Sequence, residues 1–181
     1  MALFREENTL ITDQPVLNNP ALRYIMYAII TLLTSVIHVL FIRFVTVGGV
    51  APDLLLIVCI WIALVEGQMV GLLVAFGAGL LFDIVSADVL GTNALAKILA
   101  VFIAGYFYNE NLSRRVLGTY RFLFIVLFCS FIHNLVYFFF YIQPTGINFF
   151  DFFIRYGIAT TLYTTVIAIV PMLIMARKSE F

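Results

Sequence analysis

The residues able to carry chemistry in this chain are a few charged and polar side chains set among long apolar runs. Asp83 ends one such run, and Lys97 lies near the start of the next. Charged side chains in a bilayer are costly and normally face the protein interior or pair with each other. We therefore predict an ion pair between Asp83 and Lys97 that fixes the loop between them. A proton or ion pathway is a weaker alternative, because it needs further acids at mid-membrane depth and the sequence offers none.

Two other polar groups interrupt apolar runs. His133 and Asn134 are adjacent near the middle of one run. Their ordinary use in a membrane helix is an interhelical hydrogen bond worth about 1 kcal/mol, and a substrate or proton site is the alternative. A later run contains a polar seam: Thr160, Thr161, Tyr163, Thr164 and Thr165. The sequence leaves open whether this seam is packed or solvated.

Catalytic and cofactor-binding patterns are missing from the sequence. It shows no nucleophile–base pair, no phosphate-binding glycine loop and no metal-ligand spacing. Cys59 and Cys129 each lie inside an apolar run, so we interpret both as small buried hydrophobic residues. The net charge of zero gives no electrostatic footprint for nucleic acid. We expect a protein that is not an enzyme and that binds no cofactor, metal or nucleic acid.

The composition indicates that the chain folds in a lipid bilayer. Of its 181 residues, 64% are hydrophobic and 11% are charged, where a soluble domain carries about 25% charged residues. A spanning helix needs roughly 20 mainly apolar residues. We predict an all-α polytopic membrane protein, a bundle of six helices over Tyr24–Ile42, about Gly49–Gln68, Gly67–Phe82, Asn93–Tyr108, Tyr120–Ile142 and Phe152–Met175. The start of the second span is the least defined, and Asn93 is the expected cap of the fourth.

An even number of spans places both termini on one side, and basic residues indicate which side, because positive charge is retained in the cytoplasm. With the N-terminus inside, the cytoplasmic basic residues are Arg5, Arg23, Arg114, Arg115, Arg121, Arg177 and Lys178, against Arg43, Lys97 and Arg155 outside. We predict cytoplasmic tails at 1–22 and 177–181 around one transmembrane domain, 23–176. The polar N-terminus does not resemble a signal peptide. The cluster of Arg114, Arg115 and Arg121 is expected to set topology and contact anionic lipid, with a cytoplasmic partner as the alternative.

The third predicted span carries a stripe of small residues. Gly67, Gly71, Ala75 and Gly79 recur every four residues and let another helix approach closely. Internal packing of the bundle is the favoured interpretation. Docking of a partner's transmembrane helix is the alternative.

The central segment carries a further set of spaced residues: Pro52-Asp53, Trp61, Gly71, Gly79, Asp83-Ile84-Val85-Ser86 and Leu90-Gly91. In these residues it resembles the rod shape-determining protein MreD family. The resemblance covers Pro52 to Tyr108, while the first and last spans match only in hydropathy. It implies a non-enzymatic scaffold of the bacterial elongation machinery, located in the bacterial cytoplasmic membrane. The resemblance also implies that this scaffold binds MreC and, through the complex, MreB, RodA and the penicillin-binding transpeptidase, and so helps to organise peptidoglycan synthesis and cell shape.

The same family is thought to be similar in fold to the S-components of energy-coupling-factor vitamin transporters, so a substrate-binding transporter subunit is the second hypothesis. S-components typically carry an alanine-x-x-x-alanine face on their first span, whereas here Ala28 is followed by Leu32. We therefore favour the scaffold. On this hypothesis the small residues of the third span, together with the outer loop Asp83–Gly91, shape a groove for MreC.

Overall fold

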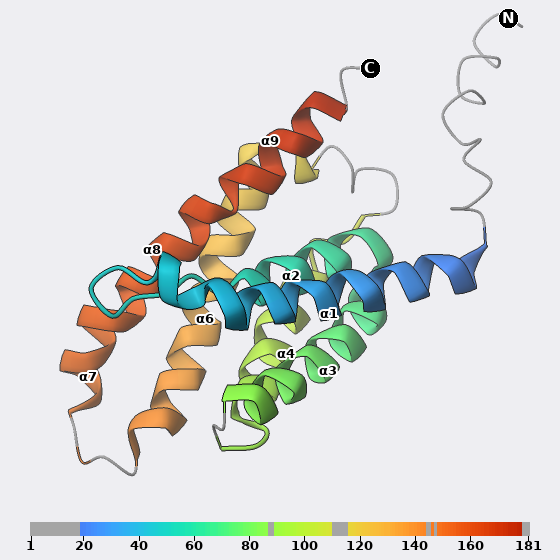
Figure 1. Cartoon of the computed structure of the whole chain (residues 1–181). Coiled ribbons are helices and arrows are strands. Elements are labelled where there is room, and N and C mark those ends of the chain that lie inside the picture. The colour runs from blue at the N-terminus through green and yellow to red at the C-terminus, as the bar shows by residue number, and fades with distance from the viewer. Residues whose placement is uncertain (1–18, 87–88, 110–115, 144–145, 147, 179–181) are drawn as a thin grey trace, which may run out of the picture.

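A computed structural model describes residues 19–86, 89–109, 116–143, 146 and 148–178. These residues form helices joined by short connections, shown in Figure 1. The first five helices are α1 (Pro20–Val45), α2 (Leu54–Glu66), α3 (Gln68–Ser86), α4 (Thr92–Gly105) and α6 (Tyr120–Ile142). A sixth, nearly continuous helix consists of α7 (Phe149–Phe152), the π-helical turn η2 (Phe153–Gly157), α8 (Ile158–Ile167) and α9 (Ile169–Lys178). The predicted all-α fold is confirmed for this part of the chain.

Four of these helical segments are long and apolar enough to cross a membrane: Pro20–Leu40, Gln68–Ser86, Tyr120–Ile142 and Phe149–Arg177. The chain is therefore a multi-pass membrane protein. The remaining two, α2 with 13 residues and α4 with 14, are shorter than a bilayer requires. Their neighbours shield them, since α2 contacts α1, α3, α4, α6 and α8.

The predicted start of the second span near Gly49 is wrong, because the helix begins at Leu54. Gly48 and Gly49 both adopt positive φ and form a tight turn, across which Val47 and Val50 exchange backbone hydrogen bonds of 3.0 Å. Asp53 then caps α2 by accepting a 2.8 Å hydrogen bond from the Leu56 N–H. The glycine pair is thus a turn signal that ends one element rather than the beginning of the next.

The boundaries on either side of the connection between α3 and α4 also differ from the prediction. The third helix extends past Phe82 to Ser86. The fourth is capped by Gly91, whose φ of 95° favours glycine, and Asn93 lies inside the first turn instead of at the cap. The sequence signal for a cap was therefore two residues too late.

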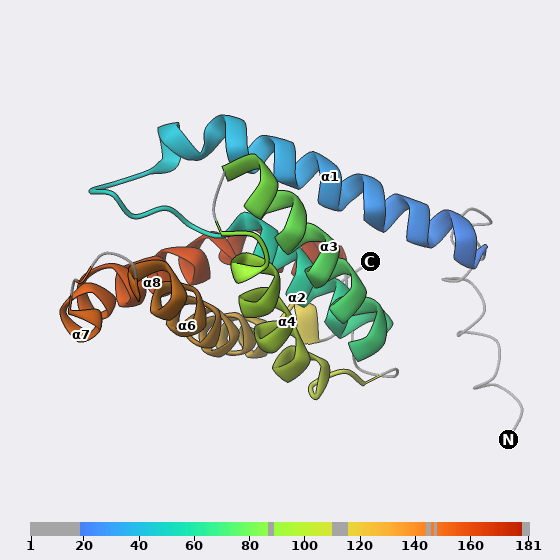
Figure 2. The ribbon, with the colours of Figure 1, turned by 90° about the horizontal axis from the view of Figure 1, so that it is seen from below.

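Consecutive helices run in alternating directions, as Figures 1 and 2 show. At one end of the bundle Arg23 pairs with Glu66, Gly67 faces Tyr108, Asn109 and Arg121 line a common groove, and Gly118 meets Ala176. We call this the basic end. The C-terminal ends of α1, α3 and α6 lie at the opposite end of the bundle.

The core is built from α2, small residues of α3 and α4, and one face of α6. Gly71 packs against Ala63 of α2, and Gly79 against the backbone of Ala94 in α4. In both places a Cβ atom on the glycine would collide with the neighbouring helix. The predicted burial of the two cysteines is confirmed, because Cys59 and Cys129 are free thiols within this core.

Candidate functional site

The most polar part of the interior is centred on Lys97 of α4, whose side chain is only 1% exposed. Its ammonium group donates to Asp53 Oδ2 at 2.6 Å and to Asn93 Oδ1 at 3.1 Å, and lies 3.3 Å from His133 Nε2. An ammonium group has three donors, and these three acceptors match them. A buried cation is tolerated in a membrane protein when it is paired in this way.

The predicted ion pair between Asp83 and Lys97 is wrong, because Lys97 pairs with Asp53 instead. Asp83 is buried and accepts hydrogen bonds from two backbone N–H groups, those of Gly91 at 2.8 Å and Asn93 at 3.1 Å. The difference follows from where the two carboxylates lie along α4. Asp83 lies opposite the first turn of α4, where unpaired N–H groups attract a carboxylate, while Asp53 faces the lysine one turn further along.

A chain of hydrogen bonds leads from Lys97 of α4 through α6, the fifth helix, to η2 and α8 of the sixth helix. With His133 protonated on Nδ1, its Nε2 accepts from Lys97 and its Nδ1 donates to Asn134 Oδ1 at 3.4 Å. Asn134 donates to Thr161 Oγ1 at 2.9 Å, and the Thr161 hydroxyl donates to the Gly157 carbonyl at 2.8 Å. The expected interhelical use of the His133–Asn134 doublet is confirmed.

The threonine seam is packed rather than solvated. Thr160, Thr161 and Thr164 are buried, and Thr164 accepts a 3.0 Å hydrogen bond from the Asp53 N–H. Tyr163 donates to the Val45 carbonyl at 2.8 Å, which ties the sixth helix to the end of α1. The sequence did not distinguish these two possibilities, because helical spacing does not show which neighbour covers a threonine.

We call Asp53, Asn93, Lys97, His133, Asn134, Thr161 and Thr164 the polar lock. Its members come from α2, α4, α6 and α8 and bind one another, so it joins these helices. Among the described residues, the Asn93 amide nitrogen is its one buried side-chain atom without a partner. The described residues also contain no group of three or more histidine, cysteine or acidic side chains placed to hold a metal ion. The polar lock therefore fixes the positions of these four helices relative to one another.

A second polar cluster, at the basic end, was missed by sequence reasoning. Glu66 accepts hydrogen bonds from the Tyr27 hydroxyl at 2.8 Å and from the Arg23 guanidinium at 2.9 Å. Arg23 and Tyr27 are four residues apart and therefore share one face of α1. That spacing was the available signal in the sequence.

The remaining residues singled out from the sequence have mixed surroundings. Pro52 is buried before α2, and the Trp61 ring packs edge-on against Tyr27 at 5.8 Å. Ser86 donates to the Phe82 carbonyl at 2.6 Å, within its own helix. Arg5, Arg114 and Arg115 lie outside the described residues. Gly71 and Gly79 face inward, as the favoured interpretation of the stripe expected.

At the end of α3 and in the loop before α4 the chain displays exposed apolar side chains: Ile84, Val85, Val89 and Leu90. The bonds from Gly91 and Asn93 to Asp83 hold this connection in place. The structure thus separates an inward set of residues from an outward one within the segment that carries the family resemblance.

The comparison with known families covers nearly all described residues. The family described as rod shape-determining protein MreD matches residues 19–178. No curated protein matches the chain, and no solved structure does. The match extends the resemblance seen in Pro52–Tyr108 to the first and last helices. The chain belongs to the MreD family of rod shape-determining membrane proteins.

Proposed function

We propose that this protein is a non-enzymatic scaffold that binds MreC in the bacterial cytoplasmic membrane and, through it, helps organise peptidoglycan synthesis by the elongation machinery. The observation that carries the proposal is the family match across residues 19–178. The polar lock supports it, because its side chains are engaged in holding helices together. A rigid bundle is what a scaffold requires.

The docking surface has to differ from the groove expected at the small-residue stripe. The space beside Gly71 is occupied by Ala63, and the space beside Gly79 by Ala94, both of the same chain. The outer loop remains a candidate, and within it Val89 and Leu90 are 74% and 65% exposed. We assign the MreC contact to Val89, Leu90 and the adjoining end of α3. Hydrogen bonds from the Gly91 and Asn93 N–H groups to Asp83 tie the start of α4 to that end of α3.

The test is co-purification of tagged protein with MreC after replacing Val89 and Leu90 by alanine. Leu73, 72% exposed on the same helix that leads into the loop, is the matched control. The Val89→Ala/Leu90→Ala protein should reach the membrane normally and recover less MreC, while Leu73→Ala recovers as much as the parent. Equal recovery by both variants would exclude this surface.

The transporter hypothesis makes a different prediction for the same preparation. A substrate-binding S-component retains a small ligand through purification, and mass spectrometry of the denatured protein would reveal it. A vitamin bound in stoichiometric amount, together with no recovery of MreC, would replace the scaffold by the transporter subunit.

A further inference from the structure

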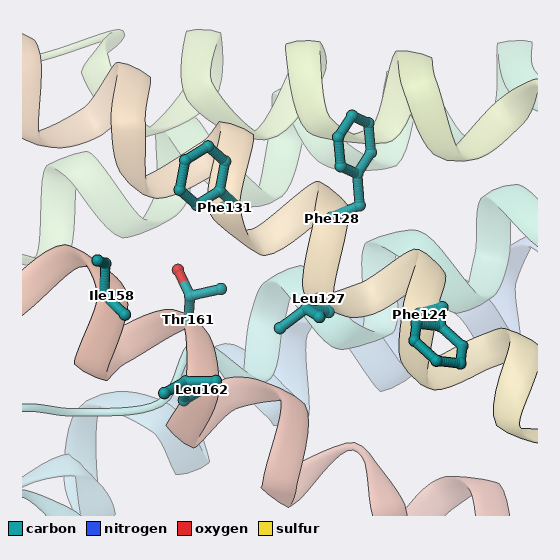
Figure 3. Close-up of a pocket in the computed structure, with 7 residues that line it drawn as sticks. All are labelled: Phe124, Leu127, Phe128, Phe131, Ile158, Thr161 and Leu162. Atoms are coloured by element: carbon teal, nitrogen blue, oxygen red, sulfur yellow. The ribbon is translucent and has the colours of Figure 1, made fainter.

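Two apolar grooves lie side by side on α6 near the basic end. One, of about 430 Å³, lies between α6 and α8 and is shown in Figure 3. The other, of about 410 Å³, lies between α6 and the segment after α4, where Phe107 and Asn109 line it. Phe124 and Phe128 line both grooves and therefore form the ridge between them. Volumes of this size are within the range of about 300–1,000 Å³ typical of ligand sites.

The surface of the first groove is hydrocarbon. It is lined by phenylalanine, leucine and isoleucine side chains and by Thr161. The Thr161 hydroxyl is bonded to Asn134 and Gly157, so its polar atom is already satisfied inside the bundle. An occupant of this groove therefore has to be apolar.

The second groove adds a cation at its membrane-surface end. Arg121, in the first turn of α6, lines that groove and is exposed. No acidic side chain of the described residues pairs with Arg121. A basic group that lines one apolar groove, next to a second apolar groove that shares its Phe124–Phe128 ridge, complements a ligand with one anionic head and two hydrocarbon chains.

The length of the grooves distinguishes such a lipid from a docked helix. From Arg121 to Phe131 the lining residues of α6 rise about 15 Å, at 1.5 Å per residue. This is half of a hydrocarbon core of about 30 Å, hence one leaflet. A partner's spanning helix would need contact over the whole depth and small residues that allow close approach, whereas the walls here are bulky.

We propose that these grooves are a binding site for one anionic phospholipid from the leaflet at the basic end. Its phosphate pairs with Arg121 and its acyl chains lie on either side of the Phe124–Phe128 ridge. The proposal does not depend on the MreC contact, which lies at the opposite end of the bundle. It goes beyond general contact between basic residues and head groups because it places the chains in defined grooves.

To test the proposal, the purified full-length protein in a mild detergent is titrated with phosphatidylglycerol or with phosphatidylcholine of identical acyl chains. The measurement is the midpoint of thermal unfolding at each lipid concentration. Phosphatidylglycerol should raise the midpoint at low molar ratio, and phosphatidylcholine should not. Arg121→Gln should require about fivefold more phosphatidylglycerol, the effect expected for one basic residue near an anionic surface. Arg155→Gln removes an exposed cation at the other end and should behave as the parent.

A second pair of variants tests the grooves themselves. Leu162→Trp fills the first groove and should abolish the phosphatidylglycerol response, whereas Leu73→Trp, on the exposed face of α3, should leave it intact. The proposal is wrong if Arg121→Gln and Arg155→Gln respond alike, or if both lipids stabilise equally. It is also wrong if Leu162→Trp keeps the lipid response but loses MreC, since the groove then belongs to a protein helix. Arg121 is exposed, so its substitution remains informative if Leu162→Trp is unstable.

Discussion

Asp53 and Lys97 form a 2.6 Å ion pair that joins the cap of α2 to the second turn of α4. Asp53 therefore has two roles: one carboxylate oxygen accepts from the Leu56 N–H, and the other binds the lysine. A single side chain thus sets both where α2 begins and where α4 lies beside it.

The first prediction concerns this pair. Removing one partner of a buried ion pair leaves an unpaired charge and costs about 3–5 kcal/mol. Lys97→Met and Asp53→Asn should each lower the unfolding midpoint sharply and reduce the yield of folded protein. The double variant should be more stable than the sum of the single losses predicts. Additive losses would show that the two residues are not coupled, and Asp151→Asn, an exposed acid, serves as control.

The second prediction separates Asp83 from Lys97. Asp83→Asn keeps one acceptor for the Gly91 or Asn93 N–H but loses the charge, so we expect a loss of about 1–2 kcal/mol. In a double-mutant cycle with Lys97→Met, the coupling energy should be smaller than that between Asp53 and Lys97. A coupling as large as that of the Asp53 pair would restore the ion pair predicted from the sequence.

The third prediction uses two glycines of α3 that have opposite surroundings. A side chain at Gly79 would collide with the Ala94 backbone, whereas a Cβ at Gly77 meets nothing within 4 Å. Gly79→Leu should therefore abolish folded protein, and Gly77→Leu should be tolerated. The readout is the monodisperse fraction in detergent size-exclusion chromatography. Folded Gly79→Leu protein with weakened MreC recovery would instead support a docking role for the stripe.

Much of the fold was predictable because a helix that spans a bilayer is apolar along its length, and such a run stands out in the hydropathy of the sequence. The helices around Tyr120–Ile142 and Gln68–Ser86 have the predicted positions within a few residues. The second helix was placed too early, because an apolar run of 13 residues was extended to satisfy the bilayer. Burial of α2 by its neighbours removes that requirement, and burial of one helix by others is not visible in a single run of sequence.

The polar lock was only partly predictable for a similar reason. Topology places Asp53, Asp83 and Lys97 at one end of the bundle, and two acids then compete for one lysine. The choice depends on whether each carboxylate faces the first or the second turn of α4, a difference of one helical turn, 5.4 Å. The contact of Lys97 with His133 required knowledge that α4 packs on α6, which hydropathy does not supply.

The last prediction is the orientation of the bundle in the membrane. The structure gathers Arg23, Arg121 and Arg177 at the basic end, while Arg155 lies toward the other end. Because positive charge is retained in the cytoplasm, the basic end should face the cytoplasm.

Single cysteines introduced at exposed Asn109 and Gln143 report the two ends of the bundle, since the native Cys59 and Cys129 are buried and should not react. In intact cells a membrane-impermeant thiol reagent should label Gln143→Cys and spare Asn109→Cys until the membrane is opened. The reverse pattern would invert the orientation and move the proposed phospholipid site to the outer leaflet, where the anionic surface potential that favours its occupancy is not available.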